Sequence, residues 1–286
     1  MLLSKSDTSR YFSNSNDSRK FKLECTADTE KWLSLKKLIK GQYSDDTIIL
    51  EGILEAENEV VIKIGRMNVL KKEYDIGLTL KEYPNFIRYY CNFNCSESKE
   101  NLDKIIEGKL SRVCSKEGKF DIGILIMPYY SLGDIENYKW KEEELGLLKN
   151  VLKQICFGLM YAYENTGFIH NDEHLGNVLL RKTSKKSLRY GDIELQLEGL
   201  YVILMDFEKS IINYSGDIYT SIKKILHLIC VSEKSDIVLA YPEHKISKLQ
   251  SAHTIITKQD YKTINDIIDE ITIRYVKSKI PLIKMF

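Results

Sequence analysis

The sequence predicts an α+β fold in two lobes, a β-rich N-terminal lobe followed by a helical C-terminal lobe. Runs of β-branched residues dominate between about residues 31 and 130. After about residue 140, apolar residues recur with the period of an amphipathic helix instead. The chain has 286 residues, of which 43% are hydrophobic, so it has enough apolar side chains to build the core of a two-lobed protein.

The predicted N-terminal lobe covers residues 31–130. It follows a segment, 1–30, that we expect to be a flexible tail because its first part is rich in Ser, Asn and Asp. β-rich runs predict strands over 48–65 (two strands joined by an acidic turn), 86–93 and 120–130. A helical pattern lies between them at 69–83, and the polar, charged composition of 96–119 predicts a loop.

The predicted C-terminal lobe covers 135–286, after a hinge at about 128–134. Five apolar residues at helical spacing predict its first helix: Leu148, Val151, Leu152, Ile155 and Leu159. Two short apolar runs, 178–180 and 201–205, flank a basic polar insert and predict a small hairpin. The helical spacing then returns twice, at 218–229 and at 264–275.

Composition excludes several classes of protein. The 42 Lys and Arg against 41 Asp and Glu give a net charge of +1, so direct nucleic-acid binding is not expected. No apolar run approaches the roughly 18 residues of a membrane helix, and the N-terminus has no signal-peptide pattern. The six cysteines include no CxxC pair, and Cys91 and Cys95 lack further metal ligands nearby. We therefore expect packed thiols, no membrane partner, and an intracellular protein, cytoplasmic or nuclear.

The stretch FIHNDEHLGNVLL (168–180), followed by VILMDFEKS (202–210), points to chemistry. Asp172 and Asn177 lie in a polar loop before a short strand, and Asp206 ends an apolar strand. Phosphoryl transfer from ATP needs one carboxylate that orients the attacking hydroxyl. It also needs an amide oxygen and a second carboxylate that hold Mg²⁺. The order H-x-D-x(4)-N, strand, Asp-Phe matches the protein-kinase signature, whereas the alternative is a surface loop that happens to contain these residues.

The upstream half supplies a lysine on a strand and a glutamate on a helix. Lys63 lies inside the apolar strand VVIKIG, where a lysine is expensive to bury unless it is paired. Glu73, ten residues further on, lies in the next helical pattern, and pairing would aim the ammonium at the ATP phosphates. Glu82 is the competing partner, and an edge-strand lysine that reaches water is the alternative.

The nucleotide-covering loop and the hinge complete the prediction. No GxGxxG is present, and Gly41 is the one glycine where a phosphate-covering turn is expected, which predicts weakened ATP binding. Met127 is predicted at the back of the nucleotide pocket. The backbone of residues 128–130 is predicted to face adenine, through Tyr129 and with Tyr130 as the donor, because Pro128 has no N–H.

Across roughly 34–230 the chain resembles a eukaryotic-type protein kinase, and 168–230 resembles haspin, an atypical serine/threonine kinase. The resemblance rests on the loop form H-x-D-x-H-x-G-N-V-L-L, on the long insert before Asp206, on Asp-Phe-Glu in place of Asp-Phe-Gly, and on GDIYTSIKKIL (216–226). The chain is similar also to kinase-like proteins of large DNA viruses, which implies a host-cell location if the source is viral.

The resemblance implies a bilobal protein-kinase-like fold with a reduced activation segment, ATP and Mg²⁺ as cofactors, and transfer to Ser or Thr of a protein, with basic or histone-like proteins among the candidate substrates. It assigns roles to seven residues: the Lys63–Glu73 ion pair, Asp172 as catalytic base, Asn177 and Asp206 as metal ligands, and His170 and Asp217 as supporting residues.

Two departures leave other functions open. Eight residues separate Glu208 from Asp217, with no A-P-E, so the usual peptide-docking platform is missing. Glu208 replaces a hinge glycine, which predicts a locked conformation. The alternatives are a small-molecule phosphotransferase of the aminoglycoside or choline kinase type and a nucleotide-binding pseudokinase. The basic insert is either a solvated hairpin or a docking site for an acidic or nucleic-acid-bound partner, through Arg181, Lys182, Lys185, Lys186 and Arg189.

Overall fold

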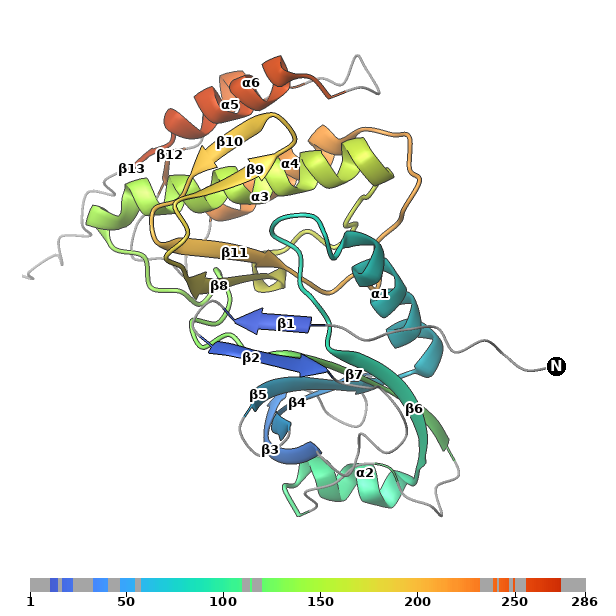
Figure 1. Cartoon of the computed structure of the whole chain (residues 1–286). Helices are drawn as coiled ribbons and strands as arrows, with labels where there is room; N and C mark the ends of the chain where they lie inside the picture. Colours follow the sequence, from blue (N-terminus) through green and yellow to red (C-terminus); the bar gives the residue numbers. More distant parts are fainter. Residues whose placement is uncertain are drawn as a thin grey trace, which may run out of the picture. The chain divides into compact units, whose positions relative to one another are not determined.

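The structure is a computed structural model. It describes residues 11–14, 17–22, 33–40, 47–54, 58–109, 114, 120–231, 239–240, 242–246, 249 and 256–273. The chain divides into two compact units (Figure 1): an N-terminal unit of Met1–Leu78 and Arg88–Tyr129, and a C-terminal unit of Thr79–Ile87 and Tyr130–Phe286. The first unit is built around an antiparallel sheet and the second is mainly helical, which confirms the predicted α+β, kinase-like fold.

The N-terminal unit is built on a five-stranded antiparallel sheet in the order β3-β4-β5-β7-β6. Its strands are β3 (Leu33–Lys40), β4 (Thr47–Leu54), β5 (Asn58–Gly65), β6 (Cys91–Glu97) and β7 (Phe120–Pro128). Its helices are α1 (Met67–Leu80), whose last residues belong to the C-terminal unit, and α2 (Lys99–Ile106). A separate hairpin, β1 (Tyr11–Asn14) with β2 (Asp17–Lys22), lies within the segment predicted as a tail.

One face of this sheet carries the apolar core of the unit. The core combines buried residues of all five strands with two of α2: Leu33, Ile48, Leu50, Leu54, Val60, Ile62, Ile64, Cys91, Phe93, Ile122, Ile124, Ile126, Leu102 and Ile105. Because side chains alternate along a strand, Lys63 lies on the opposite face from Ile62 and Ile64. The sheet therefore separates the apolar core from the lysine predicted to bind phosphate.

Helix α2 corrects the prediction of a loop over 96–119. The hydroxyl of Ser98 accepts a hydrogen bond from Asn101 N at 3.1 Å and caps the first turn of the helix. Leu102 and Ile105, three residues apart, then fall on one face and are buried against the sheet. Two apolar residues in a charged segment are a weak periodic signal, so the capping serine was the better indicator.

The predicted strand over 86–93 is divided between the two units. Asn85 has a φ of +69°, and the next residues bond to strand β11 (Leu200–Leu204) of the C-terminal unit, with Ile87 N donating to Leu204 O at 2.9 Å. The sheet strand therefore begins only at Cys91. The change of partner, from β11 to β7, divides the predicted run, and it is not visible in the apolar pattern.

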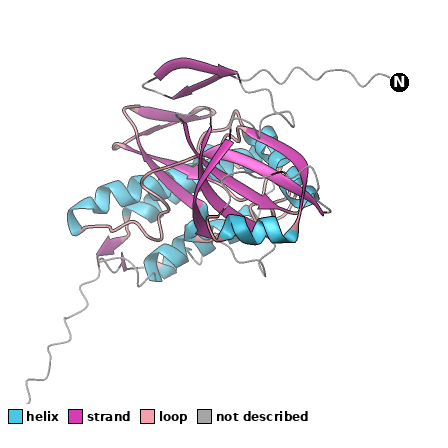
Figure 2. Ribbon diagram, turned by 90° about the horizontal axis from the view of Figure 1, so that it is seen from below, coloured by secondary structure: helices cyan, strands magenta, loops and turns pink. Residues whose placement is uncertain are grey.

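The C-terminal unit contains four helices, two 3₁₀ turns and three two-stranded sheets among its described residues (Figures 1 and 2). The helices are α3 (Leu145–Thr166), α4 (Ile218–Val231), α5 (Glu243–Ile246) and α6 (Lys258–Asp269), and the 3₁₀ turns are η2 (Glu142–Glu144) and η3 (Leu175–Asn177). The strands pair as β8 (Val178–Lys182) with β11 (Leu200–Leu204), β9 (Ser187–Tyr190) with β10 (Ile193–Gln196), and β12 (Leu239–Ala240) with β13 (Thr272–Ile273).

The helices of this unit agree with the predicted periods, with shifted ends. Helix α3 ends at Gly167, whose φ of +62° forms a left-handed cap. Helix α6 begins six residues before the predicted 264, because Thr257 and Asp260 form a capping box. It packs on α3 through the rings of Phe157 and Tyr261, whose centroids are 5.0 Å apart. The helix ends at Asp269 and residues 272–273 form a strand, so the helical repeat predicted up to residue 275 is wrong after 269, while residue 275 itself lies outside the described residues.

A buried polar network fixes β11 against α3. Asn85 donates from Nδ2 to Val202 O at 3.0 Å and to Gln154 Oε1 at 3.3 Å, and accepts from the hydroxyl of Tyr190 at 2.5 Å. Gln154 in turn accepts from Val202 N and donates to Leu200 O, both at 3.0 Å. Asn85 and Gln154 are fully buried, so every bond lost here leaves a polar group unsatisfied. The strand that leads to Asp206 is therefore rigidly placed.

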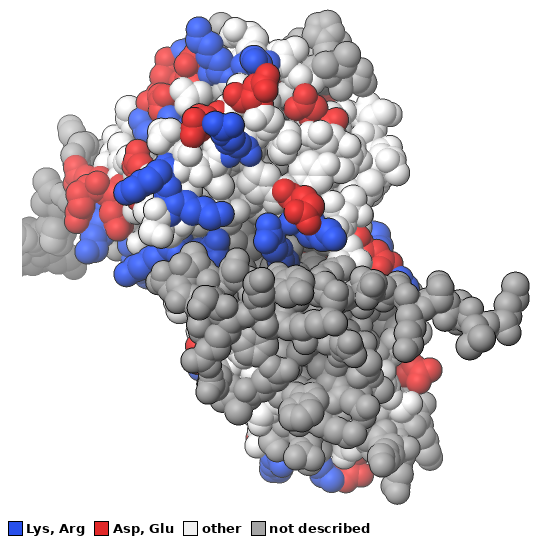
Figure 3. Space-filling view, in the orientation of Figure 1, with Lys and Arg blue, Asp and Glu red and all other residues white. Residues whose placement is uncertain are grey.

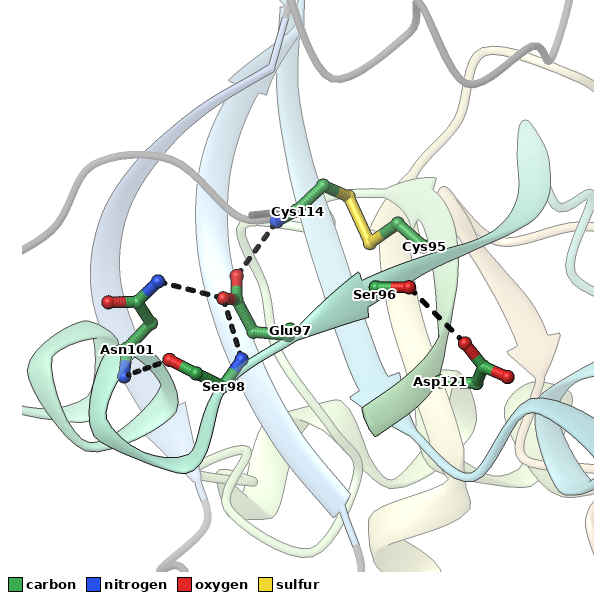
Figure 4. Close-up of a disulfide and its surroundings, with 7 residues drawn as sticks. All are labelled: Cys95, Ser96, Glu97, Ser98, Asn101, Cys114 and Asp121. Carbon is green, nitrogen blue, oxygen red and sulfur yellow. Dashed lines mark hydrogen bonds between the residues drawn. A yellow bond between two sulfur atoms is a disulfide. The ribbon is translucent and has the colours of Figure 1, made fainter. Parts of the chain in front are cut away.

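The sequence predicts packed thiols, and this prediction is wrong for two of the cysteines. Cys91, Cys156 and Cys230 are free and buried, but Cys95 and Cys114 form a disulfide (Figure 4). Beside it, the buried carboxylate of Glu97 accepts hydrogen bonds at 2.9 Å from the backbone N–H groups of Ser98 and Cys114. The cysteine pattern therefore no longer supports the intracellular location inferred from it. Among the described residues, no helix is long and apolar enough to cross a membrane.

Candidate active site

In the N-terminal unit, Lys63 and Glu73 form a buried ion pair. Lys63 Nζ lies 2.8 Å from Glu73 Oε2, and the hydroxyl of Tyr89 donates to Glu73 Oε1 at 2.6 Å. Only 5% of Lys63 and 1% of Glu73 are exposed, so the pair is shielded from water and its geometry is held from two sides. The pairing predicted from the sequence is present, whereas its role toward phosphate stays a prediction.

Gly123 brings the helix of this pair close to the sheet. A Cβ at Gly123 on β7 would lie 2.9 Å from the Cα of Met67, at the start of α1. A side chain at this position would therefore force the start of α1 to shift relative to β7. Glu82, the competing partner in the sequence, is an exposed side chain with Lys81 at 4.0 Å.

The predicted nucleotide-pocket residues lie along the end of β7. Met127 is buried and opposite Val61 of β5, on the same face of the sheet as Lys63. Tyr129 is 37% exposed, and its N–H donates to Glu59 O at 3.4 Å. Tyr130 belongs to the C-terminal unit, where its carbonyl accepts from Gly133 N. Gly41 lies outside the described residues.

In the C-terminal unit, the β8–β11 hairpin brings Asn177 and Asp206 to the same end. Val178, the first residue of β8, pairs with Leu204, the last residue of β11. Met205 N donates to Asn177 O at 3.1 Å, so the residue before Asp206 is bonded to Asn177. Asp206 itself adopts a left-handed φ of +66°. Two residues that are 29 positions apart in the sequence therefore meet at one strand end.

Asp172 lies beside them on the loop before η3. Asn177 Nδ2 donates to the backbone carbonyl of Asp172 at 3.0 Å, which fixes the loop independently of the Asp172 carboxylate. That carboxylate is 25% exposed, with Lys209 Nζ 2.9 Å from Oδ1 and His174 Nε2 3.9 Å from Oδ2. Partial burial opposes ionisation, but the hydrogen bond and charge of Lys209 outweigh it and lower the pKa of Asp172. The group is therefore an ionised carboxylate, as a base must be.

His170 is buried behind this loop. Burial lowers its pKa, so the ring is neutral, and Nε2 donates to Met205 O at 2.9 Å. Nδ1 is buried without a hydrogen-bond partner. The ring packs against Phe168 and Phe207, at centroid distances of 6.1 and 5.8 Å. These contacts suit a residue that braces the loop.

Glu173 is a residue of this loop that sequence reasoning missed. Its buried carboxylate accepts from Ser221 Oγ at 2.5 Å and from Asn171 N at 3.2 Å, and Lys224 Nζ lies 3.3 Å from its other oxygen. Ser221 and Lys224 belong to α4, so Glu173 ties the loop that carries Asp172 to that helix. Asp217 accepts from Tyr219 N and Thr220 Oγ1 at the start of α4, and its supporting role stays a prediction.

The donor set at this strand end suits magnesium. Asp206 and Asn177 offer a carboxylate and an amide oxygen, the hard ligands that Mg²⁺ prefers, and Mg²⁺ usually takes its remaining ligands from water and substrate phosphates. No group of three His, Cys, Asp or Glu side chains that could hold a metal occurs among the described residues. The described residues therefore show no metal site made of protein ligands alone. Asp206 and Asn177 suit a site in which nucleotide phosphates and water supply the other ligands of Mg²⁺.

The segment after Asp206 is held at two points. The ring of Phe207 is fully buried between Phe86 and Phe168, and Ser210 Oγ donates to His170 O at 2.9 Å. A turn closes between them, with Ser210 N donating to Phe207 O at 3.1 Å. Glu208 therefore lies in a turn that is already fixed on both sides.

Glu208→Gly is expected to leave the turnover number unchanged and to lower the free energy of unfolding by about 0.5–1 kcal/mol. The glycine adds freedom to the unfolded chain, while the neighbouring contacts keep the folded turn in place. Steady-state kinetics and urea denaturation measure the two effects. Glu198→Gly, on an exposed loop, is the matched control. A large gain in rate would show that Glu208 suppresses activity.

The basic insert forms an exposed surface on this unit. Figure 3 shows Lys and Arg side chains gathered on the face that carries β8 and β9 in Figure 1. Lys182, Lys185, Lys186 and Arg189 are exposed there. The guanidinium of Arg181 lies 4.6 Å from the ring centroid of Tyr201, and Lys185 Nζ lies 5.8 Å from it.

Known proteins similar to the chain are kinases. It is 36% identical over 87 residues to the serine/threonine-protein kinase haspin of Mus musculus, and 34% identical over 87 residues to that of Bos taurus. These matches cover 29% of this chain and 12% and 11% of the relatives. An AarF domain-containing kinase 1 of Drosophila melanogaster is 26% identical over 162 residues, 49% of this chain and 30% of that protein. No protein-family model matches the chain.

The chain thus spans about an eighth of the length of mouse haspin and under a third of the AarF relative. The similarity is partial, and it supports a protein of the atypical, kinase-like phosphotransferase kind.

Proposed function

We propose that this protein is an ATP- and Mg²⁺-dependent phosphotransferase that phosphorylates Ser or Thr hydroxyls of a protein. The observation that carries the proposal is the meeting of Asp172, Asn177 and Asp206 at one end of the β8–β11 hairpin. An ionised carboxylate beside an amide and a second carboxylate is the set that phosphoryl transfer requires. The buried Lys63–Glu73 pair of the other unit supports the same reaction.

Each residue has a distinct task in the proposed reaction. Asp172 accepts the proton of the attacking hydroxyl, and Asn177 and Asp206 hold Mg²⁺, which neutralises charge on the phosphates. Lys63, oriented by Glu73, binds the phosphates that are not transferred. Met127, Tyr129 and Tyr130 border the adenine, and His170 and Glu173 keep the catalytic loop in place. Gly41 is the proposed turn over the phosphates.

The choice of a protein acceptor rests on the partial similarity to proteins named serine/threonine-protein kinases. The short segment between Glu208 and Asp217 leaves little room for a peptide-docking platform of the usual kind. Recognition must therefore use other surfaces, and a basic or histone-like protein is our proposed acceptor class.

A small-molecule acceptor is the second candidate. The observation that favours it is the longer match, 49% of the chain, to a kinase whose name specifies no protein acceptor. A pseudokinase is disfavoured, because Lys63, Glu73, Asp172, Asn177 and Asp206 are all present and the first two are paired.

A labelled-phosphate assay separates these candidates. The wild-type protein is incubated with γ-labelled ATP and Mg²⁺, with a panel of basic proteins including histones and, in parallel, with amines, sugars and alcohols. We expect label on Ser or Thr of at least one basic protein. Label on small acceptors alone would show that the protein is a small-molecule phosphotransferase. If neither proteins nor small molecules were labelled while the protein still bound nucleotide, it would be a pseudokinase.

Asp206→Asn is expected to weaken binding of Mg·ATP by about tenfold or more, because a neutral amide is a poorer ligand for a hard cation than a carboxylate. Calorimetric titration of Mg·ATP, and of ATP with EDTA as the metal-free control, measures the effect. We expect Asp206→Asn to bind Mg·ATP more weakly than wild type does, and we expect both proteins to bind metal-free ATP with the same affinity. Equal Mg·ATP affinities would make Asp206 a structural residue.

A further inference from the structure

Lys209 is placed on Asp172 by a rigid turn. On one side of Lys209, the ring of Phe207 is fully buried, and on the other Ser210 is buried and bonded to His170 O. The backbone carbonyl of Lys209 accepts from Asn171 Nδ2 at 3.4 Å, so the backbone itself contacts the catalytic loop. The side chain thus starts from a fixed position, although it is 59% exposed.

The ammonium of Lys209 has donors left for a second acceptor. It carries three N–H groups, and the structure shows one hydrogen bond from it, to Asp172 Oδ1 at 2.9 Å. Because the side chain is largely exposed, its remaining N–H groups are open to a second acceptor beside the Asp172 carboxylate. A cation at this place, three residues after a proposed metal ligand, is suited to bind the oxygens of a phosphoryl group.

An alternative explanation is that Lys209 and Asp172 form an ordinary surface ion pair. Such exposed pairs contribute little to stability, and their removal has little effect. The chain contains a pair of that kind in the same unit, Lys258 with Asp192, also at 2.9 Å, with side chains 72% and 79% exposed. It differs in that neither residue lies on the catalytic loop, so it serves as the matched control.

We propose that Lys209 is a further catalytic residue, one that binds the oxygens of the phosphoryl group during transfer while it holds Asp172 in place. This inference rests on the proposed phosphotransferase function. As the hydroxyl oxygen forms its bond to the γ-phosphorus, the bond from that phosphorus to the oxygen shared with ADP breaks, and ADP leaves with the electron pair. The hydroxyl proton passes to Asp172. Lys209 keeps its proton and neutralises the charge on the phosphoryl oxygens.

Kinetics of Lys209→Met and Lys209→Arg provide the first test. We expect Lys209→Met to lower kcat by about 10²-fold, the usual effect of removing one donor to a developing oxyanion, with Lys209→Arg retaining most of the rate. The KM for ATP is expected to change less than about threefold, since the ground-state phosphates are bound elsewhere. Lys258→Met is expected to match wild type in both values.

The second test is calorimetric and needs no turnover. Affinity for Mg·ADP is compared with and without aluminium fluoride, which mimics the phosphoryl group in transfer. We expect aluminium fluoride to tighten binding in wild type and Lys258→Met but not in Lys209→Met. An equal gain in all three proteins, or Lys209→Met turning over at the wild-type rate while Asp172→Asn is inactive, would overturn this inference alone. Absence of transfer by the wild type to any acceptor would overturn the proposed function together with it.

Discussion

Asp172→Asn is expected to lower kcat by about 10²–10⁴-fold, the usual contribution of a positioned general base. The amide has nearly the same shape as the carboxylate, and the bond that Asn177 makes to the backbone carbonyl of Asp172 does not involve the side chain. The loop should therefore keep its position while the proton acceptor is lost. Affinity for Mg·ATP should change little, because in the proposed reaction Asp172 contacts the acceptor hydroxyl and not the nucleotide.

Rapid-quench kinetics and nucleotide titration of Asp172→Asn check both expectations. Asp192→Asn is the control, because Asp192 also pairs with a lysine at 2.9 Å but lies on the exposed turn between β9 and β10 and not on the Asp172 loop. A kcat for Asp172→Asn within a factor of about three of wild type would remove Asp172 from the chemistry.

Lys63→Met is expected to abolish detectable phosphotransfer, and the structure adds a stability effect. Lys63 Nζ lies 2.8 Å from a carboxylate that is 1% exposed. Removing that cation from a buried pair typically destabilises a protein by about 3–5 kcal/mol, even though methionine has a similar volume. Loss of activity in this variant alone could therefore reflect unfolding.

The double variant Lys63→Met/Glu73→Gln separates the two effects. A glutamine keeps an oxygen that can accept from the hydroxyl of Tyr89, and it carries no buried charge. We expect the double variant to regain most of the stability in urea denaturation and to stay inactive. Lys71→Met/Asp75→Asn, which removes an exposed pair on α1, is the control and should keep the wild-type stability and the wild-type phosphotransfer activity. A stable, active double variant would exclude Lys63 from phosphate binding.

The sequence predicts the elements whose signal is local. Lys63 is recognisable because a lysine in an apolar strand needs a partner, and Glu73 because it lies on the next helix. The ends of β8 and β11 follow from two short apolar runs, and their pairing brings Asn177 and Asp206 together. Each of these predictions uses the period of one element and the order of the chain.

The features that could not be predicted depend on contacts between distant segments. A glutamate in a polar loop, such as Glu173, is expected from the sequence to be exposed. Its partners Ser221 and Lys224 come from α4, so they are supplied only by the packing of that helix. The pairing of Cys95 with Cys114 needs the fold of the segment between them. The break after Asn85 depends on bonds to β11, more than a hundred residues later.

The most direct test of the central claim is whether the γ-phosphate of ATP reaches a protein hydroxyl in an Asp172-dependent way. Wild type and Asp172→Asn are incubated with γ-labelled ATP, Mg²⁺ and the best basic-protein acceptor, and the labelled protein is hydrolysed and its phosphoamino acids are separated. We predict phosphoserine or phosphothreonine from the wild type and at most a trace from Asp172→Asn. Equal labelling by the two proteins, or no labelled amino acid from a wild type that binds Mg·ATP, would contradict the account.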